Sequence, residues 1–259
     1  MIPGATVQMG IDATDVPQLQ TIFALEGMEL FEAEIPKHTV TVSSFYIDRR
    51  LVTNSQFKQF VDENAAWQTD HISRGLHNGN HRRHWKPTSI PAGRENHPVV
   101  NVSWYAAVAY CRWAGKLLPT EAEWEHAAKG SLQGTFPWGN EAADKGRANY
   151  DGSGIGTTSA VGSYAANGYG LFDMAGNIWE FLADEWQPYS SDAQQNPVAG
   201  GDLFVRRDSF LKIKTRRVIR GGSYGGDAIN LWVEYRDSHP PENAKKFVGF
   251  RCAKSLDAE

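Results

Sequence analysis

The 259-residue chain has little cysteine, only Cys111 and Cys252. Two cysteines are too few for a disulfide-rich scaffold, and they lie too far apart for a CxxC site. No apolar run reaches the length of a membrane span. Basic residues are not in excess: 26 Lys and Arg against 30 Asp and Glu give a charge of −4, which disfavours nucleic-acid binding. The start of the chain lacks the basic and apolar regions of a signal peptide, so we expect a cytoplasmic protein if this N-terminus is native.

Glycine, proline and tryptophan are abundant, at 25, 12 and 9 residues. Glycine and proline break up regular structure, and many tryptophans suggest loops that aromatic packing holds together. Capping boxes at Thr53 and Thr120, and Ser103 before an apolar stretch, predict three short helices. Without a linker or repeat, the sequence indicates one α+β domain over residues 1–259, with few helices, small antiparallel sheets and little regular structure. We expect a monomer.

Two segments offer candidate metal ligands. Asp173, Asn177 and Glu180 are oxygen donors among glycines, as Ca²⁺ prefers, but spacing alone favours side chains that cap turns. His77, His81 and His84 could offer imidazoles to a transition metal. Because they lie in a loop with arginines that repel cations, an exposed or ligand-contacting loop is the better interpretation.

The segment RGGSYGGDAINLWVEYRDSHPP, from residue 220 to 241, combines glycine pairs with aromatic and charged residues. Such a mixture suits a recognition surface, whereas a buried strand with Arg–acid pairs is the alternative. The ligand-binding candidates are Tyr224, Asp227, Trp232, Glu234, Arg236 and His239. Strand alternation puts Trp232, Glu234 and Arg236 on one face, although Arg236 could instead be a buried partner of an acid.

Several blocks, in the same order, resemble the formylglycine-generating enzyme (sulfatase-modifying factor) family. They are IPGATVQMG, VTNSQFKQFV, LPTEAEWE, FPWGN, NGYGLFDMAGNIWE, RGGSY and GFRCA, and they span nearly the whole chain. The resemblance implies the family's variant of the C-type lectin fold. It also implies, for the typical member, oxidation of a sulfatase cysteine to formylglycine by O₂, in some members with copper.

The reacting cysteine pair of the family would fall at Gly226 and Leu231. Neither residue can form a thiolate or bind Cu(I), so we expect neither this oxidase activity nor copper, and iron stays open. Ser223 matches an active-site serine of the family, and Ser223 and His239 are the candidates for any catalytic role. Cys111 and Cys252 match a structural disulfide of secreted members, so they are expected to be neighbours, either as a disulfide or as thiols.

The resemblance also implies structural Ca²⁺ at two places. One set would be Asn149, the Tyr150 carbonyl and Asp151; the other would be Asn177, the Ile178 carbonyl and Glu180.

Three functions compete. The first is a divergent family member that binds a small molecule or peptide in the family groove, with or without non-cysteine oxidative or maturation chemistry. The second is a non-catalytic ligand-binding or display module on the C-type lectin fold. The third, a true formylglycine-generating oxidase, is disfavoured by Gly226 and Leu231.

Overall fold

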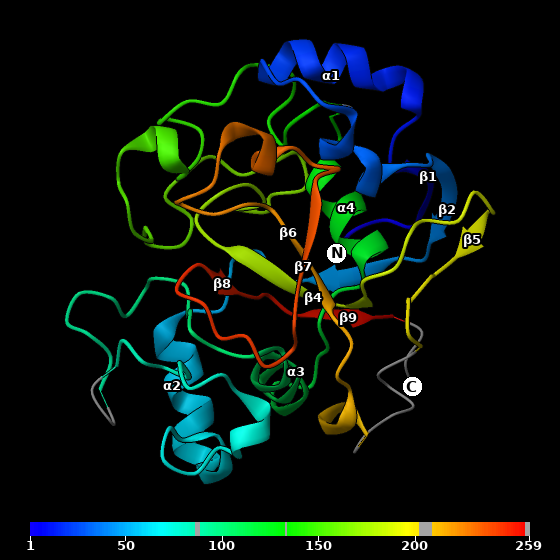
Figure 1. The fold of residues 1–259 in the computed structure, drawn as a ribbon. Helices are drawn as coiled ribbons and strands as arrows, with labels where there is room; N and C mark the ends of the chain where they lie inside the picture. Colours follow the sequence, from blue (N-terminus) through cyan, green and yellow to red (C-terminus); the bar gives the residue numbers. More distant parts are fainter. Residues whose placement is uncertain (86–88, 133, 202–208, 257–259) are drawn as a thin grey trace.

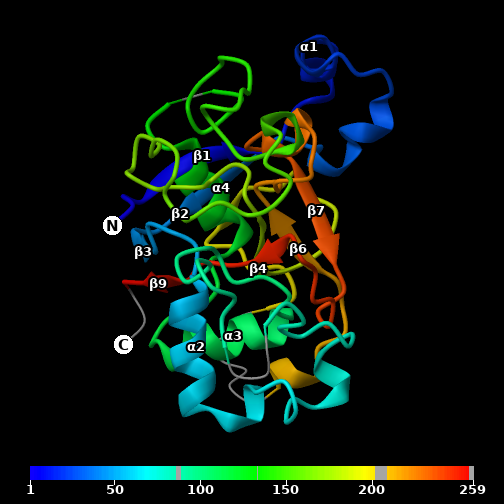
Figure 2. The same cartoon turned by 90° about the vertical axis from the view of Figure 1, so that its left-hand side faces the viewer.

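The computed structural model describes residues 1–85, 89–132, 134–201 and 209–256. Helices α2 and α3 lie at one end of the molecule, α1 lies at the other, and the sheets run between them (Figures 1 and 2). The helices are α1 (Val16–Phe23), α2 (Asn54–Glu63), α3 (Trp104–Trp113) and α4 (Glu121–Lys129). The longest have ten residues, so no described helix can cross a bilayer, which takes about 20.

Three predicted helices begin where their caps placed them. Thr53 accepts a hydrogen bond from the Gln56 N–H at 3.3 Å, and the Gln56 side chain accepts one from the Thr53 N–H at 2.9 Å. Thr120 and Glu123 form the same reciprocal pair at the start of α4. The Ser103 hydroxyl accepts from the Ala106 N–H before α3. Local polar chemistry therefore fixes these starts, as capping predicts.

The strands form three small sheets. One has the order β1-β2-β5, one pairs β3 with β9, and the largest has the order β7-β6-β4-β8. Most pairs are antiparallel, as predicted, but β2–β5 and β4–β8 are parallel, so the sheets are mixed. The strands are β1 (Ala5–Met9), β2 (His38–Val42), β3 (Phe45–Ile47), β4 (Trp179–Glu185), β5 (Gln194–Gln195), β6 (Arg217–Arg220), β7 (Arg236–His239), β8 (Val248–Gly249) and β9 (Ala253–Ser255).

The two cysteines join distant parts of the chain. Cys111 on α3 and Cys252 beside β9 form a disulfide with their Cα atoms 5.6 Å apart. Both are fully buried, in a core that also contains Trp104 and Phe250. The bond closes 141 residues of sequence, a stretch that includes α4 and the largest sheet.

Candidate functional site

The chain turns sharply after β6, at Gly221 and Gly222. Both have positive φ, 93° and 72°, and a Cβ on Gly222 would lie 2.7 Å from the Asn230 carbonyl oxygen. A side chain there would be strained and would also clash, so glycine is required. This turn brings Ser223 and Tyr224 inward, where they are 3% and 8% exposed.

The two positions of the family's cysteine pair have different surroundings. Gly226 is half-buried, and its carbonyl accepts a hydrogen bond from the Asp151 N–H at 3.0 Å. Leu231 is 1% exposed and packs with Phe136, Ala148 and Ala175. The second position is therefore part of the hydrophobic core.

The predicted strand through residues 231–236 is wrong. The structure has a 3₁₀ helix, Ala228–Leu231, followed by a turn, and β7 begins only at Arg236. Asp227 is the exposed N-cap of that 3₁₀ helix. The 3₁₀ helix passes so close to Gly222 that a Cβ there would lie 2.7 Å from the Asn230 carbonyl oxygen, and the period-2 pattern of a strand does not describe this compact path.

Trp232 and Arg236 are buried, so they do not form an exposed ligand-contacting face in this structure. Trp232 is 2% exposed, with its ring centroid 6.0 Å from those of Phe23 and Phe31. Arg236 makes two 2.8 Å hydrogen bonds to Glu121. The alternative for Arg236, a buried partner of an acid, is the one observed.

A buried ionic network extends from Arg236, of which the sequence predicted an Arg–acid pair but not the other members. Arg220, fully buried, bonds to Glu121 at 3.0 Å and to Glu125 at 2.5 Å. Lys129 bridges Glu125 and Glu234, at 2.8 and 3.1 Å. Glu234, a predicted ligand contact, is thus engaged in an ion pair. The sequence held one sign of this network: the first turn of α4 contains Glu121 as well as Glu123, and only Glu123 is needed for capping.

Among the described residues, the two catalytic candidates, Ser223 and His239, form no hydrogen bond with each other. Ser223 lies in the turn, where its carbonyl accepts from the Gly226 N–H at 3.0 Å. His239 ends β7, with its ring centroid 6.3 Å from that of Phe247, and burial lowers its pKa. The Tyr224 hydroxyl donates to the Lys246 carbonyl at 3.3 Å, and burial raises its pKa.

The first predicted calcium set is hydrogen-bonded to Ser153 of its own loop. The Asn149 side-chain oxygen accepts from the Ser153 hydroxyl at 3.1 Å, and the Tyr150 carbonyl accepts from the Ser153 N–H at 2.9 Å. Asp151 is exposed. Two of the three expected ligands therefore already have hydrogen-bond partners.

Two side chains of the second predicted calcium set, Asn177 and Glu180, already have hydrogen-bond partners. Both oxygens of Glu180 accept from Arg251, at 2.7 and 3.0 Å, and Asn177 is bonded to the Ser159 backbone. Asp173 has one oxygen bonded to the Gly162 N–H, while its buried Oδ1 atom makes no hydrogen bond of ordinary geometry and lies near the Asn177 side chain. An unpaired buried carboxylate oxygen is costly, and a hard cation would satisfy it.

Asp173 lies in a cluster of buried charges. Asp173 and Glu180 are both buried, and burial raises the pKa of each, while Arg251 is the fully buried guanidinium beside them. The cluster thus has one more buried carboxylate than buried guanidinium. No group of three or more His, Cys, Asp and Glu side chains in the described part of the chain is arranged as a metal site, so backbone or water oxygens would have to complete the coordination.

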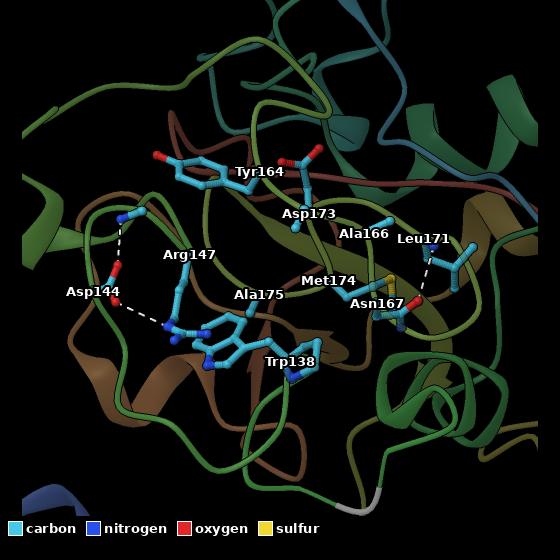
Figure 3. A pocket seen from close by; sticks show the side chains of 13 residues that line it. Trp138, Asp144, Arg147, Tyr164, Ala166, Asn167, Leu171, Asp173, Met174 and Ala175 are labelled. Carbon is cyan, nitrogen blue, oxygen red and sulfur yellow. Dashed lines mark hydrogen bonds and ion pairs between the residues drawn. The ribbon is translucent and has the colours of Figure 1, made fainter.

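A pocket of about 370 Å³ lies beside this cluster (Figure 3). Leu171, Met174 and Ala175 line it with apolar surface, and Tyr164 and Asp173 lie across from Trp138. The Trp138 ring is stacked on Phe136 with centroids 4.9 Å apart and planes 8° apart. Burial and the nearby Asp173 raise the pKa of Tyr164.

Arg147 lies at one side of the pocket and is held by two acids. It pairs with Asp144 at 3.1 Å and also with Glu141. Sequence reasoning missed this site, because Trp138 entered only through the FPWGN block and the other lining residues are scattered over 137–175. The volume and the mixture of aromatic, apolar and polar groups are typical of small-molecule pockets.

The protein is thus a loop-rich α+β domain with a small pocket and without the cysteine pair. The chain belongs to the sulfatase-modifying factor enzyme 1-like domain family, whose profile matches residues 1–256. It is 36% identical over 298 residues to the formylglycine-generating enzyme of Thermomonospora curvata, covering 97% of this chain and 91% of that one. The mouse enzyme is 31% identical over 300 residues, covering 97% and 73%.

Solved structures show the same fold. PvdO from Pseudomonas aeruginosa superposes with a TM-score of 0.71 at 24% identity, covering 98% of this chain and 92% of that one. Treponema denticola variable protein 1 gives 0.69 at 23% identity, covering 98% and 94%. The predicted family and fold class are confirmed.

Proposed function

We propose that this chain binds a small molecule or peptide on the family scaffold and does not oxidise cysteine to formylglycine. The observation that carries the proposal is Leu231, which is 1% exposed among Phe136, Ala148 and Ala175. The family resemblance implies a reacting thiol at that position. Leucine cannot form a thiolate or a mixed disulfide, and its burial leaves no room there for a substrate thiol.

The pocket at Trp138 is the proposed ligand site. Trp138 and Ala175 line it and also pack in the same cluster as Leu231, so the pocket adjoins the position of the missing thiol. The pocket offers an aromatic face at Trp138 and a hydroxyl at Tyr164. Its 370 Å³ suits a small molecule, or one side chain of a peptide.

A ligand screen with matched tryptophan variants tests this site. Compounds of metabolite size, covering anionic, cationic and neutral classes, are screened by thermal shift, and hits are measured by calorimetry. Trp138→Ala should abolish binding of the hits. Trp113→Ala removes a half-buried tryptophan outside the pocket and should leave binding intact. Hits that bind both variants equally would place the ligand elsewhere.

We further propose that a structural Ca²⁺ binds at Asp173. The buried Asp173 Oδ1 atom, which makes no hydrogen bond of ordinary geometry, and the excess buried carboxylate support it. When bound, the ion would neutralise this charge and stabilise the folded loop through residues 173–180. Elemental analysis of protein purified without chelator, compared with Asp173→Asn, tests whether calcium is present in a fixed ratio.

A further inference from the structure

The loop after the 3₁₀ helix Arg74–Leu76 contains an Asn–Gly dipeptide, Asn78–Gly79, next to a histidine. The Gly79 N–H donates to His77 Nδ1 at 3.0 Å. Because an N–H can only donate, Nδ1 is the acceptor, and this ring nitrogen is placed to take the Gly79 proton. Asn78 and Gly79 are both exposed, so water reaches them.

Glycine makes its own backbone nitrogen accessible to the preceding side chain. Gly79 has a φ of 86°, and a Cβ built on it would meet nothing within 4 Å. No side chain therefore shields the Gly79 nitrogen from the Asn78 carboxamide, and the backbone is free to move toward it.

The Asn78 carboxamide is polarised by the backbone. Its Oδ1 atom accepts from the Asn80 N–H at 3.2 Å and from the Ala244 N–H at 3.3 Å. Two N–H groups on one oxygen would stabilise the negative charge that develops there when the carbonyl carbon is attacked. Its Nδ2 atom donates to the Asn243 side-chain oxygen at 3.2 Å.

We propose that Asn78 is a self-modification site, at which the folded protein converts its own asparagine to aspartate or isoaspartate. His77 Nδ1 takes the proton from the Gly79 nitrogen, which bonds to Asn78 Cγ. The Cγ–Nδ2 bond then breaks, and the nitrogen leaves as ammonia after gaining a proton. The resulting succinimide adds water at either carbonyl and opens to aspartate or isoaspartate. No oxidant or reductant takes part.

The product would lose a contact between two segments. Asn78 connects its loop to Asn243 and Ala244, which lie between β7 and β8. A carboxylate at position 78 has no N–H to donate and would face the Asn243 oxygen with a negative charge. Modification would therefore weaken the contact between the loop and the segment that follows His239.

The chain contains a second Asn–Gly pair for comparison, Asn167–Gly168. The Asn167 oxygen also accepts from two backbone N–H groups, those of Tyr169 and Leu171, and its Nδ2 atom also donates, to the Ala127 carbonyl. No histidine in the described part of the chain accepts from the Gly168 nitrogen. The two sites differ in the base and also in access, because Asn167 is half-buried and a Cβ on Gly168 would clash with the Ser131 hydroxyl oxygen.

The experiment follows both asparagines in the same sample. Folded protein is incubated at neutral pH and body temperature, and peptide mapping by mass spectrometry quantifies aspartate and isoaspartate at 78 and 167 over time. Asn78 should react faster than Asn167, by on the order of 100-fold if the base contributes at the lower end of the usual range. In urea-unfolded chain, where the hydrogen bonds are lost, the two rates should converge.

Variants isolate the base. His77→Ala should lower the rate at Asn78 by on the order of 100-fold and leave the rate at Asn167 unchanged. If His77→Ala reduces folding, His77→Gln provides the same test with a side chain that can accept a hydrogen bond but is not a base. Equal rates at both sites in folded wild-type protein, or a rate at Asn78 that is unchanged in the folded His77 variants, would overturn the proposal.

Discussion

The C-terminal segment and the pocket meet in one hydrophobic cluster but have opposite characters. In the segment, Leu231 and Trp232 are 1% and 2% exposed. In the pocket, Trp138 is half-buried, is stacked on Phe136, and lines a hollow of about 370 Å³. Both regions combine aromatic and charged residues. Residue type therefore does not separate a binding surface from core; the partners of each side chain do.

The charges show the same difference. Arg236 has its carboxylate partner Glu121 within 2.8 Å, whereas Asp173 has a buried oxygen with no hydrogen bond of ordinary geometry. The buried ion pair satisfies its own charges, whereas an unpaired buried carboxylate oxygen carries a desolvation cost, which the proposed Ca²⁺ at Asp173 would offset.

The largest expected effect comes from the disulfide, which encloses both regions. Cys111 and Cys252 are separated by 141 residues, so reduction should lower the free energy of unfolding by about 4–5 kcal/mol in the chain-entropy model. Urea unfolding with and without reductant measures it. A difference well below about 2 kcal/mol, the lower end of the usual range, would contradict the expectation.

The next effect tests whether the C-terminal segment is core. Trp232→Ala should destabilise the fold by about 3–5 kcal/mol, because it leaves a cavity between Phe23 and Phe31. Arg236→Ala should destabilise the fold less, by about 1.5–3 kcal/mol, because it removes the two hydrogen bonds from Arg236 to buried Glu121, which keeps Arg220 as its ionic partner. Variants that keep wild-type stability in urea but lose a ligand would restore the segment as the binding site.

Removal of calcium should have an intermediate effect on the free energy of unfolding. If the ion is present at 100 times its dissociation constant, it stabilises the fold by about 2.7 kcal/mol, which EDTA should remove. Asp173→Asn should abolish this response to EDTA in thermal unfolding, whereas Asp151→Asn, at the exposed member of the other set, should retain it. An identical melting curve with and without EDTA would refute the calcium proposal.

The smallest stability effect is expected in the pocket. Trp138→Ala removes one half-buried ring stacked on Phe136, a pair worth about 0.5–1.5 kcal/mol beyond its buried area. The loss should be clearly smaller than that of Trp232→Ala in the same urea series. Equal losses would mean that the two tryptophans do not differ in the way the structure indicates.

Local features of the fold were predictable from the sequence. The caps at Thr53, Ser103 and Thr120 gave three helix starts, because a capping hydrogen bond depends on residues three positions apart. The resemblance of the sequence blocks to the family then predicted the fold, which the spacing of apolar and capping residues alone could not. The parallel pairs β2–β5 and β4–β8 were not predicted, since they join segments far apart in sequence.

The site was less predictable. The composition of residues 220–241 suggested a surface, but Trp232 is covered by Phe23 and Phe31 from the N-terminal region, a contact that no local pattern indicates. Asp173 was recognised as an oxygen donor, while its unpaired Oδ1 atom depends on packing around it. The pocket at Trp138 also depends on loops that meet only in the folded chain.

Oxidation of a sulfatase-type peptide tests whether this chain has lost the oxidase chemistry of its relatives. The protein is incubated with Cu(I), air and a peptide containing CxPxR, with the Thermomonospora curvata enzyme as the positive control. Mass spectrometry then follows conversion of the peptide cysteine to the aldehyde. We predict conversion by the control and none by this protein, because Gly226 and Leu231 provide no thiol. Aldehyde formation by this protein above the enzyme-free level would contradict the account.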